Sequence, residues 1–131
     1  MSVDLFAFSD APLQDASALL PFRNWKLHSD RWTCGTKGWQ VVVNASAPVE
    51  SLDLEHVRTA VARSCPEARY FTSIHVEGKQ SSEAMMIAAG SAHRIPYQGR
   101  GAIYDPQQDT LALPLSAGPW RLLAGPEGPE L

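Results

Sequence analysis

Apolar residues alternate along the start of the chain in the way expected of a β-strand. Over Val3–Phe8 the odd positions form one face and the even positions the other, and both faces carry apolar side chains. Apolar residues on both faces are typical of a strand inside a covered sheet, so we predict a central strand here. A short helix is predicted next, with Asp10 as its cap, Pro12 in its first turn and an end before Pro21.

Two further apolar runs predict a β-hairpin. Phe22–Leu27 and Trp39–Asn44 both alternate in polarity, and the turn-forming stretch Gly35-Thr-Lys-Gly38 lies between them. Trp32 and Cys34 extend either arm equally well. The pattern therefore predicts two paired strands joined by a long, irregular turn, and it leaves their register open.

Helical spacing marks two later segments. From Ser51, a candidate N-cap, apolar residues recur every three or four positions up to Pro66. Alanine and methionine dominate Glu83–His93, where Ser81 or Ser82 can cap the first turn. We expect a helix over each of these segments.

The remaining patterns predict more β-structure. Tyr70–Val76 is rich in β-formers and alternates in polarity, which predicts a strand. Ile95-Pro96 breaks the second of the two helices. Residues 101–109 are rich in turn formers and lead into the apolar run Thr110–Leu113, which predicts a second hairpin.

The order of these elements predicts an α+β fold. Strand, helix, strand, strand, helix, strand is the split βαβ pattern of ferredoxin-like folds. We therefore expect a ferredoxin-like βαββαβ core, extended by a C-terminal helix and a β-hairpin. Residues 1–115 are expected to form a single domain, and the proline- and glycine-rich residues 116–131 a C-terminal arm or tail.

Composition narrows the cellular setting. The 131 residues are 44% hydrophobic and 19% charged, and the net charge is −3. The 11 Lys and Arg residues are scattered, which disfavours nucleic acid and anionic membranes as partners. The N-terminal apolar run is too short for export or spanning, and Cys34 and Cys65 make no disulfide framework. These features favour a cytoplasmic protein.

No catalytic or cofactor motif stands out in the sequence. The four histidines form none of the spacings that bind zinc, and no phosphate-binding glycine loop is present. Asp105 and Asp109 bracket a turn with too few oxygen ligands for calcium. Cys34 lies in a glycine-flanked turn that would expose it, while Cys65 ends a helix, where the dipole disfavours a thiolate. We expect no metal and no cofactor.

Three tryptophans come from the first predicted hairpin. Trp25, Trp32 and Trp39 are too large to share one small core easily, although aromatic residues on a sheet usually pack beneath helices. Exposed tryptophan near arginine, here Arg23 and Arg31, is enriched at contact hot spots. The sequence thus offers a hydrophobic anchor for a protein partner.

The run from Glu83 to Leu113 resembles a pattern in small bacterial α+β proteins. It joins a helix of small residues to the string Gly101-Ala-Ile-Tyr-Asp-Pro-Gln107 and a following strand. Some of those proteins resemble immunity proteins of polymorphic toxin systems. The resemblance implies a compact acidic domain, without chemistry of its own, that covers a toxin's active site.

These observations favour a non-enzymatic protein-binding domain, most specifically an immunity protein that neutralises a cognate toxin. One alternative is a small enzyme or ligand-binding domain, with a pocket between sheet and helices formed by His75, Tyr104 and Cys34. Another is a self-associating subunit, such as a homodimer paired through a strand edge or the C-terminal arm. For the first hypothesis the expected contact residues are Trp32 and Trp39 as anchors and Asp30, Glu50, Glu77, Asp105 and Asp109 as charges facing a basic groove.

Overall fold

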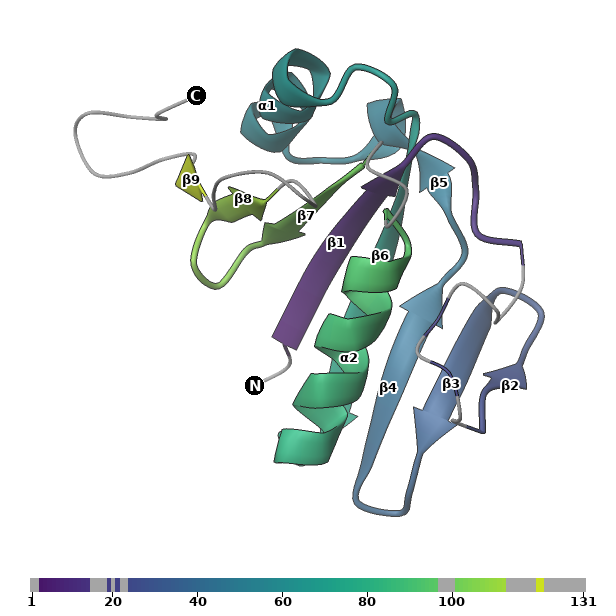
Figure 1. Cartoon of the computed structure of the whole chain (residues 1–131). Helices are drawn as coiled ribbons and strands as arrows, with labels where there is room; N and C mark the ends of the chain where they lie inside the picture. The colour runs from purple at the N-terminus through teal and green to yellow at the C-terminus, as the bar shows by residue number, and fades with distance from the viewer. Residues whose placement is uncertain are drawn as a thin grey trace.

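The computed structural model describes residues 3–14, 19, 21, 24–96, 101–112 and 120–121. These residues form an α+β fold, in which two α-helices pack against an open antiparallel sheet (Figure 1). The strands are β1 (Val3–Ser9), β2 (Lys26–Leu27), β3 (Arg31–Gly35), β4 (Trp39–Asn44), β5 (Ala47–Pro48), β6 (Tyr70–Gly78), β7 (Ala102–Asp105), β8 (Thr110–Ala112) and β9 (Trp120–Arg121). The helices are α1 (Glu55–Ser64), α2 (Ser82–Arg94) and the short 3₁₀ helix η2 (Val49–Ser51).

The sheet runs in the order β2-β3-β4-β6-β1-β7-β8-β9, and β5 pairs with the start of β6. Neighbouring strands are antiparallel. The prediction of a central first strand is confirmed, because β1 pairs with β6 on one side and with β7 on the other. Phe8 lies opposite Phe71 of β6 and Ala102 of β7.

The structure does not show the ferredoxin-like strand order. That order would place β4 beside β1 and would send the strand after α1 to the outer side of β1. Instead β6 lies between β4 and β1, and β7 takes the outer position. The physical reason is burial. Thr72, Ile74 and Val76 of β6 are buried on one face and Phe71 packs on the other, so the whole strand suits the interior of the sheet.

The predicted helix after the first strand is not found where it should begin. Residues 12–14 are not helical, and residues 15–18 and 20 lie outside the described residues. The backbone N–H of Leu13 donates to Ser46 Oγ at 2.8 Å, which ties this segment to the chain after β4. Leu19 is fully buried in the core.

The first predicted hairpin has a different first strand. β4 pairs with β3 (Arg31–Gly35), not with the Phe22–Leu27 segment, of which Lys26–Leu27 forms β2 on the far side of β3. Phe22 and Arg23 lie outside the described residues. Trp32 and Cys34 therefore belong to a middle strand of a three-stranded meander, and the turn at Gly35-Thr-Lys-Gly38 is confirmed.

Both later helices exist, but only one begins as predicted. Ser81 caps α2 by accepting a hydrogen bond from the N–H of Ala84 at 3.1 Å, as expected. Ser51 does not cap α1, because its hydroxyl donates to the carbonyl of Pro48 and closes η2 instead. The helix begins at Glu55, after Leu54.

The predicted strand at Tyr70 and the second hairpin are confirmed as β6 and as β7–β8. Residues 113–119 and 122–131 lie outside the described residues, so most of the predicted C-terminal arm is not described. One part of it is a strand, since Trp120–Arg121 pairs with β8.

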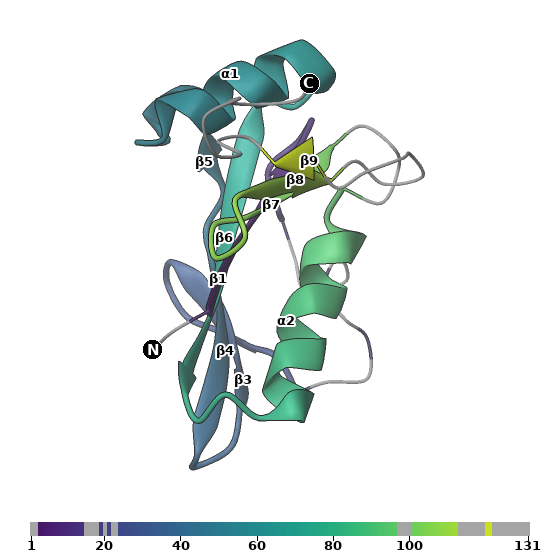
Figure 2. The same ribbon diagram turned by 90° about the vertical axis from the view of Figure 1, so that its left-hand side faces the viewer.

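Two hydrophobic clusters cover the two faces of the sheet. Helix α2 packs on one face, which we call the α2 face, and α1 packs at one end of the opposite face, which we call the α1 face (Figures 1 and 2). The α2 face buries Leu19, Trp32, Cys34, Val41, Val43, Ile74, Val76 and Ile103 against Ala84, Ile87, Ala88 and Ala92 of the helix. The α1 face buries Phe8, Ala102, Tyr104 and Leu111 with Leu52, Val57, Ala60, Val61, Cys65 and Ala68.

Candidate functional site

A histidine, a tyrosine and an aspartate meet between α1 and the β7–β8 hairpin. Tyr104 Oη donates to Asp109 Oδ1 at 2.6 Å, and His56 Nε2 lies 3.3 Å from the same oxygen. The rings of His56 and Tyr104 meet edge to face, with centroids 6.1 Å apart. Asp109 ends the hairpin turn with φ 54°, a left-handed conformation that aspartate adopts more readily than most residues. The turn thus aims its carboxylate at α1.

The electrostatics of this cluster suit a structural role. Burial raises the pKa of the Tyr104 hydroxyl, and the hydrogen bond to Asp109 and the charge of that carboxylate raise it further. A tyrosine held so firmly in its neutral form is a poor proton donor near neutral pH, because a catalytic acid or base needs a pKa near the working pH. The cluster links helix and hairpin.

We expect Tyr104→Phe to lower the free energy of unfolding by about 1.5 kcal/mol at pH 7, since it removes a hydrogen bond to a charged group. The pH dependence follows from the raised pKa. In the unfolded chain Tyr104 ionises at about pH 10, whereas the folded protein retains its proton, so this part of the stability is lost as pH rises above 10. Urea unfolding at pH 9 and 11 should therefore show a steeper loss for wild type than for Tyr104→Phe. Equal losses of unfolding free energy in the two proteins would contradict a raised pKa of Tyr104.

The tryptophans are placed differently from their predicted role. Trp32 is buried under α2 with 8% of its surface exposed, so it offers little surface for the partner contact that was predicted for it. Trp39 and Trp25 are partly buried and pack against the same cluster. Side chains alternate between the two faces of a sheet along each strand, and the positions of Trp32 and Trp39 place both on the face that α2 covers.

The predicted acidic contact residues are spread over the molecule. Asp30 is exposed and pairs with Arg31 at 3.1 Å, and this guanidinium lowers the pKa of the Asp30 carboxyl. Glu77, also exposed, lies at the opposite end of the β4–β6 ladder, and Glu50 lies beside α1. Asp105 accepts the N–H of Gln107 in the turn that leads to Asp109. The structure brings together only the last two acids.

The pocket expected from His75, Tyr104 and Cys34 is not formed. Cys34 is buried in the cluster on the α2 face, whereas Tyr104 lies in the cluster on the α1 face. His75 bonds instead to Glu77, 3.3 Å away. The exposed position predicted for Cys34 is also wrong, because both cysteines are buried. Burial raises the pKa of the Cys65 thiol.

Part of the α1 face is covered by neither of the two described α-helices. Below α1, the strands β3, β4, β6 and β1 have no described helix on the side away from α2 (Figure 2). Strand pairing places a set of their side chains on one face, because Asp4 lies opposite His75, Gln40 opposite Glu77 and Arg31 opposite Asn44. We call this surface the open sheet face, defined by Asp4, Arg31, Gln40, Asn44, His75 and Glu77.

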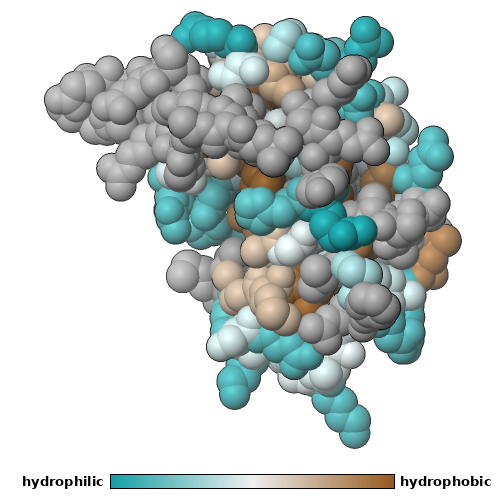
Figure 3. Space-filling view, in the orientation of Figure 1, coloured by the Kyte–Doolittle hydropathy of each residue, from teal (hydrophilic) through white to brown (hydrophobic). Residues whose placement is uncertain are grey.

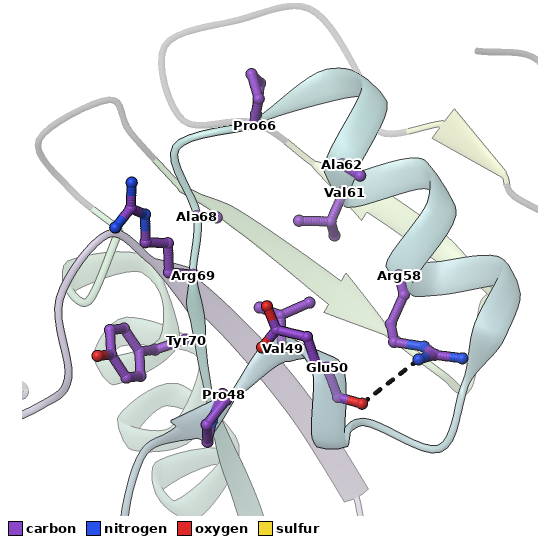
Figure 4. Close-up of a pocket in the computed structure, with 10 residues that line it drawn as sticks. All are labelled: Pro48, Val49, Glu50, Arg58, Val61, Ala62, Pro66, Ala68, Arg69 and Tyr70. Atoms are coloured by element: carbon purple, nitrogen blue, oxygen red, sulfur yellow. Dashed lines mark hydrogen bonds between the residues drawn. The ribbon is translucent and has the colours of Figure 1, made fainter.

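A pocket of about 680 Å³ lies beside α1 and η2, and it includes none of the three residues of the tyrosine cluster (Figure 4). Its wall includes Arg58, a residue that helical spacing assigns to the solvent side of α1 but which is half-buried. No sequence signal predicted this pocket or the tyrosine cluster. His56 and Asp109 are 53 residues apart, and the pocket depends on how η2 packs against α1.

The chain matches no protein-family model, no curated protein and no solved structure. Within the described ranges, no helix is long and apolar enough to cross a membrane. The same ranges contain no group of three or more histidine, cysteine or acidic side chains placed to hold a metal ion.

Proposed function

We propose that this chain is a non-enzymatic protein-binding domain that docks its partner on the open sheet face. The more specific form of the proposal is a cytoplasmic immunity protein of a bacterial toxin system, which follows the resemblance over Glu83–Leu113. The observation that carries the proposal is a broad sheet surface that neither helix covers (Figure 2).

The side chains of the open sheet face are preorganised. Asn44 Nδ2 donates to Ser73 Oγ at 2.8 Å, and His75 is held by Glu77. Such bonds limit the rotamers that these side chains adopt, which reduces the entropy lost when a partner binds. Val42, buried beneath them, gives this surface an apolar base.

Charge favours a basic partner. Asp4 and Glu77 are carboxylates on this face, and the charge of Arg31 is matched by Asp30. Lys26 of the outer strand β2 lies opposite Thr33, which places it on the same face, so the two carboxylates and this one cation leave a single net negative charge. This charge would favour a basic groove over acidic competitors. In this proposal the partner is recognised by polar and charged contacts, in place of the tryptophan anchor expected from the sequence.

The substitution Gln40→Arg tests the docking surface. Gln40 is exposed and lies opposite Glu77. An arginine at this position would add bulk to the open sheet face and offset its negative charge. It would also form a favourable cross-strand pair with Glu77, so the fold should tolerate the change. We expect at least about a tenfold loss of affinity for the partner, the size of a hot-spot substitution. Co-expression with the product of the adjacent gene, followed by titration calorimetry, measures this.

The matched control is Ala89→Arg, which adds the same side chain at an exposed position of α2. It should leave the affinity unchanged. If the adjacent gene product forms no complex and its toxicity is not relieved, the immunity role is wrong. If both arginine variants bind as wild type does, the partner docks elsewhere.

Self-association is a second candidate, supported by one observation. Leu27 on the edge strand β2 is 69% exposed, and the space-filling view shows an isolated hydrophobic patch at that edge (Figure 3). Edge strands with exposed apolar side chains can pair with a second copy. Light scattering over a concentration series measures the oligomeric state of the protein. A dimer should form at high concentration, and Leu27→Lys should abolish it.

A further inference from the structure

The pocket between α1 and η2 has features of a ligand site that the protein-docking proposal does not use. It lies where η2, α1 and the start of β6 meet, away from the open sheet face (Figure 4). Its volume of about 680 Å³ is within the range of small-molecule sites. The lining residues that bear on a ligand are Val49, Glu50, Arg58, Val61 and Ala68.

The wall of this pocket is largely apolar and rigid. Val61 and Ala68 are buried members of the cluster on the α1 face, and Val49 packs against that cluster. Pro48 and Pro66 have fixed backbone φ angles. An apolar ligand body would therefore meet a preformed surface and lose little free energy to rearrangement.

Arg58 supplies an unusual polar group at the edge of this surface. Its Nη1 donates to the carbonyl of Glu50 over a long 3.4 Å, and its Nε is buried without any hydrogen-bond partner. A guanidinium has five N–H donors and no acceptor. Leaving a buried donor unpaired costs about 1–3 kcal/mol, so an anion that engaged this guanidinium would recover part of that cost.

Glu50 brings a negative charge to the rim of this pocket. Figure 4 shows its backbone carbonyl facing the Arg58 guanidinium, whereas its carboxylate points away from that guanidinium. The residue is exposed, so its side chain is in contact with solvent. The charge of Glu50 would therefore oppose the binding of a second anion in this pocket.

We propose that this pocket binds a small amphipathic carboxylate, such as a medium-chain fatty acid. The apolar chain lies on Val49, Val61 and Ala68, and the carboxylate accepts hydrogen bonds from the Arg58 guanidinium. Arginine can pair with a carboxylate through two parallel N–H···O bonds, which are stronger than hydrogen bonds between neutral groups. The site is independent of the open sheet face.

Octanoate and 1-octanol are the matched probes, since they share the chain length and differ in charge. In titrations followed by ¹H–¹⁵N NMR, octanoate should shift amides of η2, α1 and the start of β6. It should bind at least about tenfold more tightly than octanol, which corresponds to about 1.4 kcal/mol. Equal affinity for the two probes, or shifts located elsewhere, would overturn the proposal.

Two variants assign the charge effect to the pocket. Arg58→Gln should reduce octanoate affinity to that of octanol, while thermal unfolding reports whether the variant remains folded. Glu50→Gln removes a negative charge from the rim of the pocket and should raise octanoate affinity severalfold without affecting octanol. An unchanged or lower octanoate affinity in Glu50→Gln would show that the octanoate carboxylate does not bind beside this residue. Neither result depends on the adjacent gene product, so the pocket and the docking face are tested separately.

Discussion

Replacing Phe8 by alanine should lower the free energy of unfolding by about 3–5 kcal/mol, the range for removing a fully buried aromatic ring. Phe8 has no exposed surface, lies on the central strand β1 and faces Phe71 with ring centroids 6.5 Å apart. Its ring supports the cluster beneath α1. A small domain has a total stability of about 5–15 kcal/mol, so the variant loses a large share of it. Urea denaturation monitored by tryptophan fluorescence measures the difference.

The control for this experiment is Met86→Ala on α2. Met86 is 52% exposed, so its truncation should change the stability by less than about 0.5 kcal/mol. If Phe8→Ala cost less than about 1 kcal/mol, a value typical of partly exposed positions, the α1 face would not be a packed core. The position of α1 over the sheet would then be wrong as well.

The second large effect is expected from Gly78→Ala, at the end of β6. Gly78 has φ +85°, and a Cβ there would lie 2.5 Å from the carbonyl oxygen of Gly38. That oxygen already accepts a hydrogen bond from the N–H of Lys79, so it is not free to move away. Backbone strain of this kind costs about 1–3 kcal/mol, and the steric clash adds to it. We expect a loss at the upper end of that range in urea denaturation.

Gly38→Ala is the matched control, because the same change occurs at the other side of the same contact. A Cβ at Gly38 has no atom within 4 Å, and its φ is not positive. This variant should be neutral or slightly stabilising, since alanine restricts the unfolded chain. Comparable losses in both glycine variants would show that the β4 turn and the end of β6 do not meet as described.

Local patterns in this sequence were sufficient to predict several elements. Alternating apolar residues on both faces identified β1 as central, and Ser81, one of the two candidate caps, marks the start of α2. Ser51 shows the limit of such signals, because a serine hydroxyl can satisfy a nearby carbonyl as well as a helix N-terminus. Propensity alone cannot choose between these two partners.

The order of the strands in the sheet could not be predicted from the sequence. The ferredoxin-like prediction rested on element order, which leaves open whether β4 or β6 pairs with β1. The burial of Trp32 was missed for a related reason, since the face to which a strand residue points depends on the register with its neighbours. The contact of Asp109 with His56 joins residues 53 positions apart, and local sequence patterns do not reveal such a contact.

Carbethoxylation of histidines, followed by mass spectrometry, tests the central claim that a partner docks on the open sheet face. His75 is half-buried on that face, and His93 is exposed on α2 on the other side of the sheet, so one sample contains both the probe and its control. With the adjacent gene product bound, we predict that modification of His75 slows markedly while that of His93 does not change. Protection of His93 with unchanged modification of His75 would contradict the account.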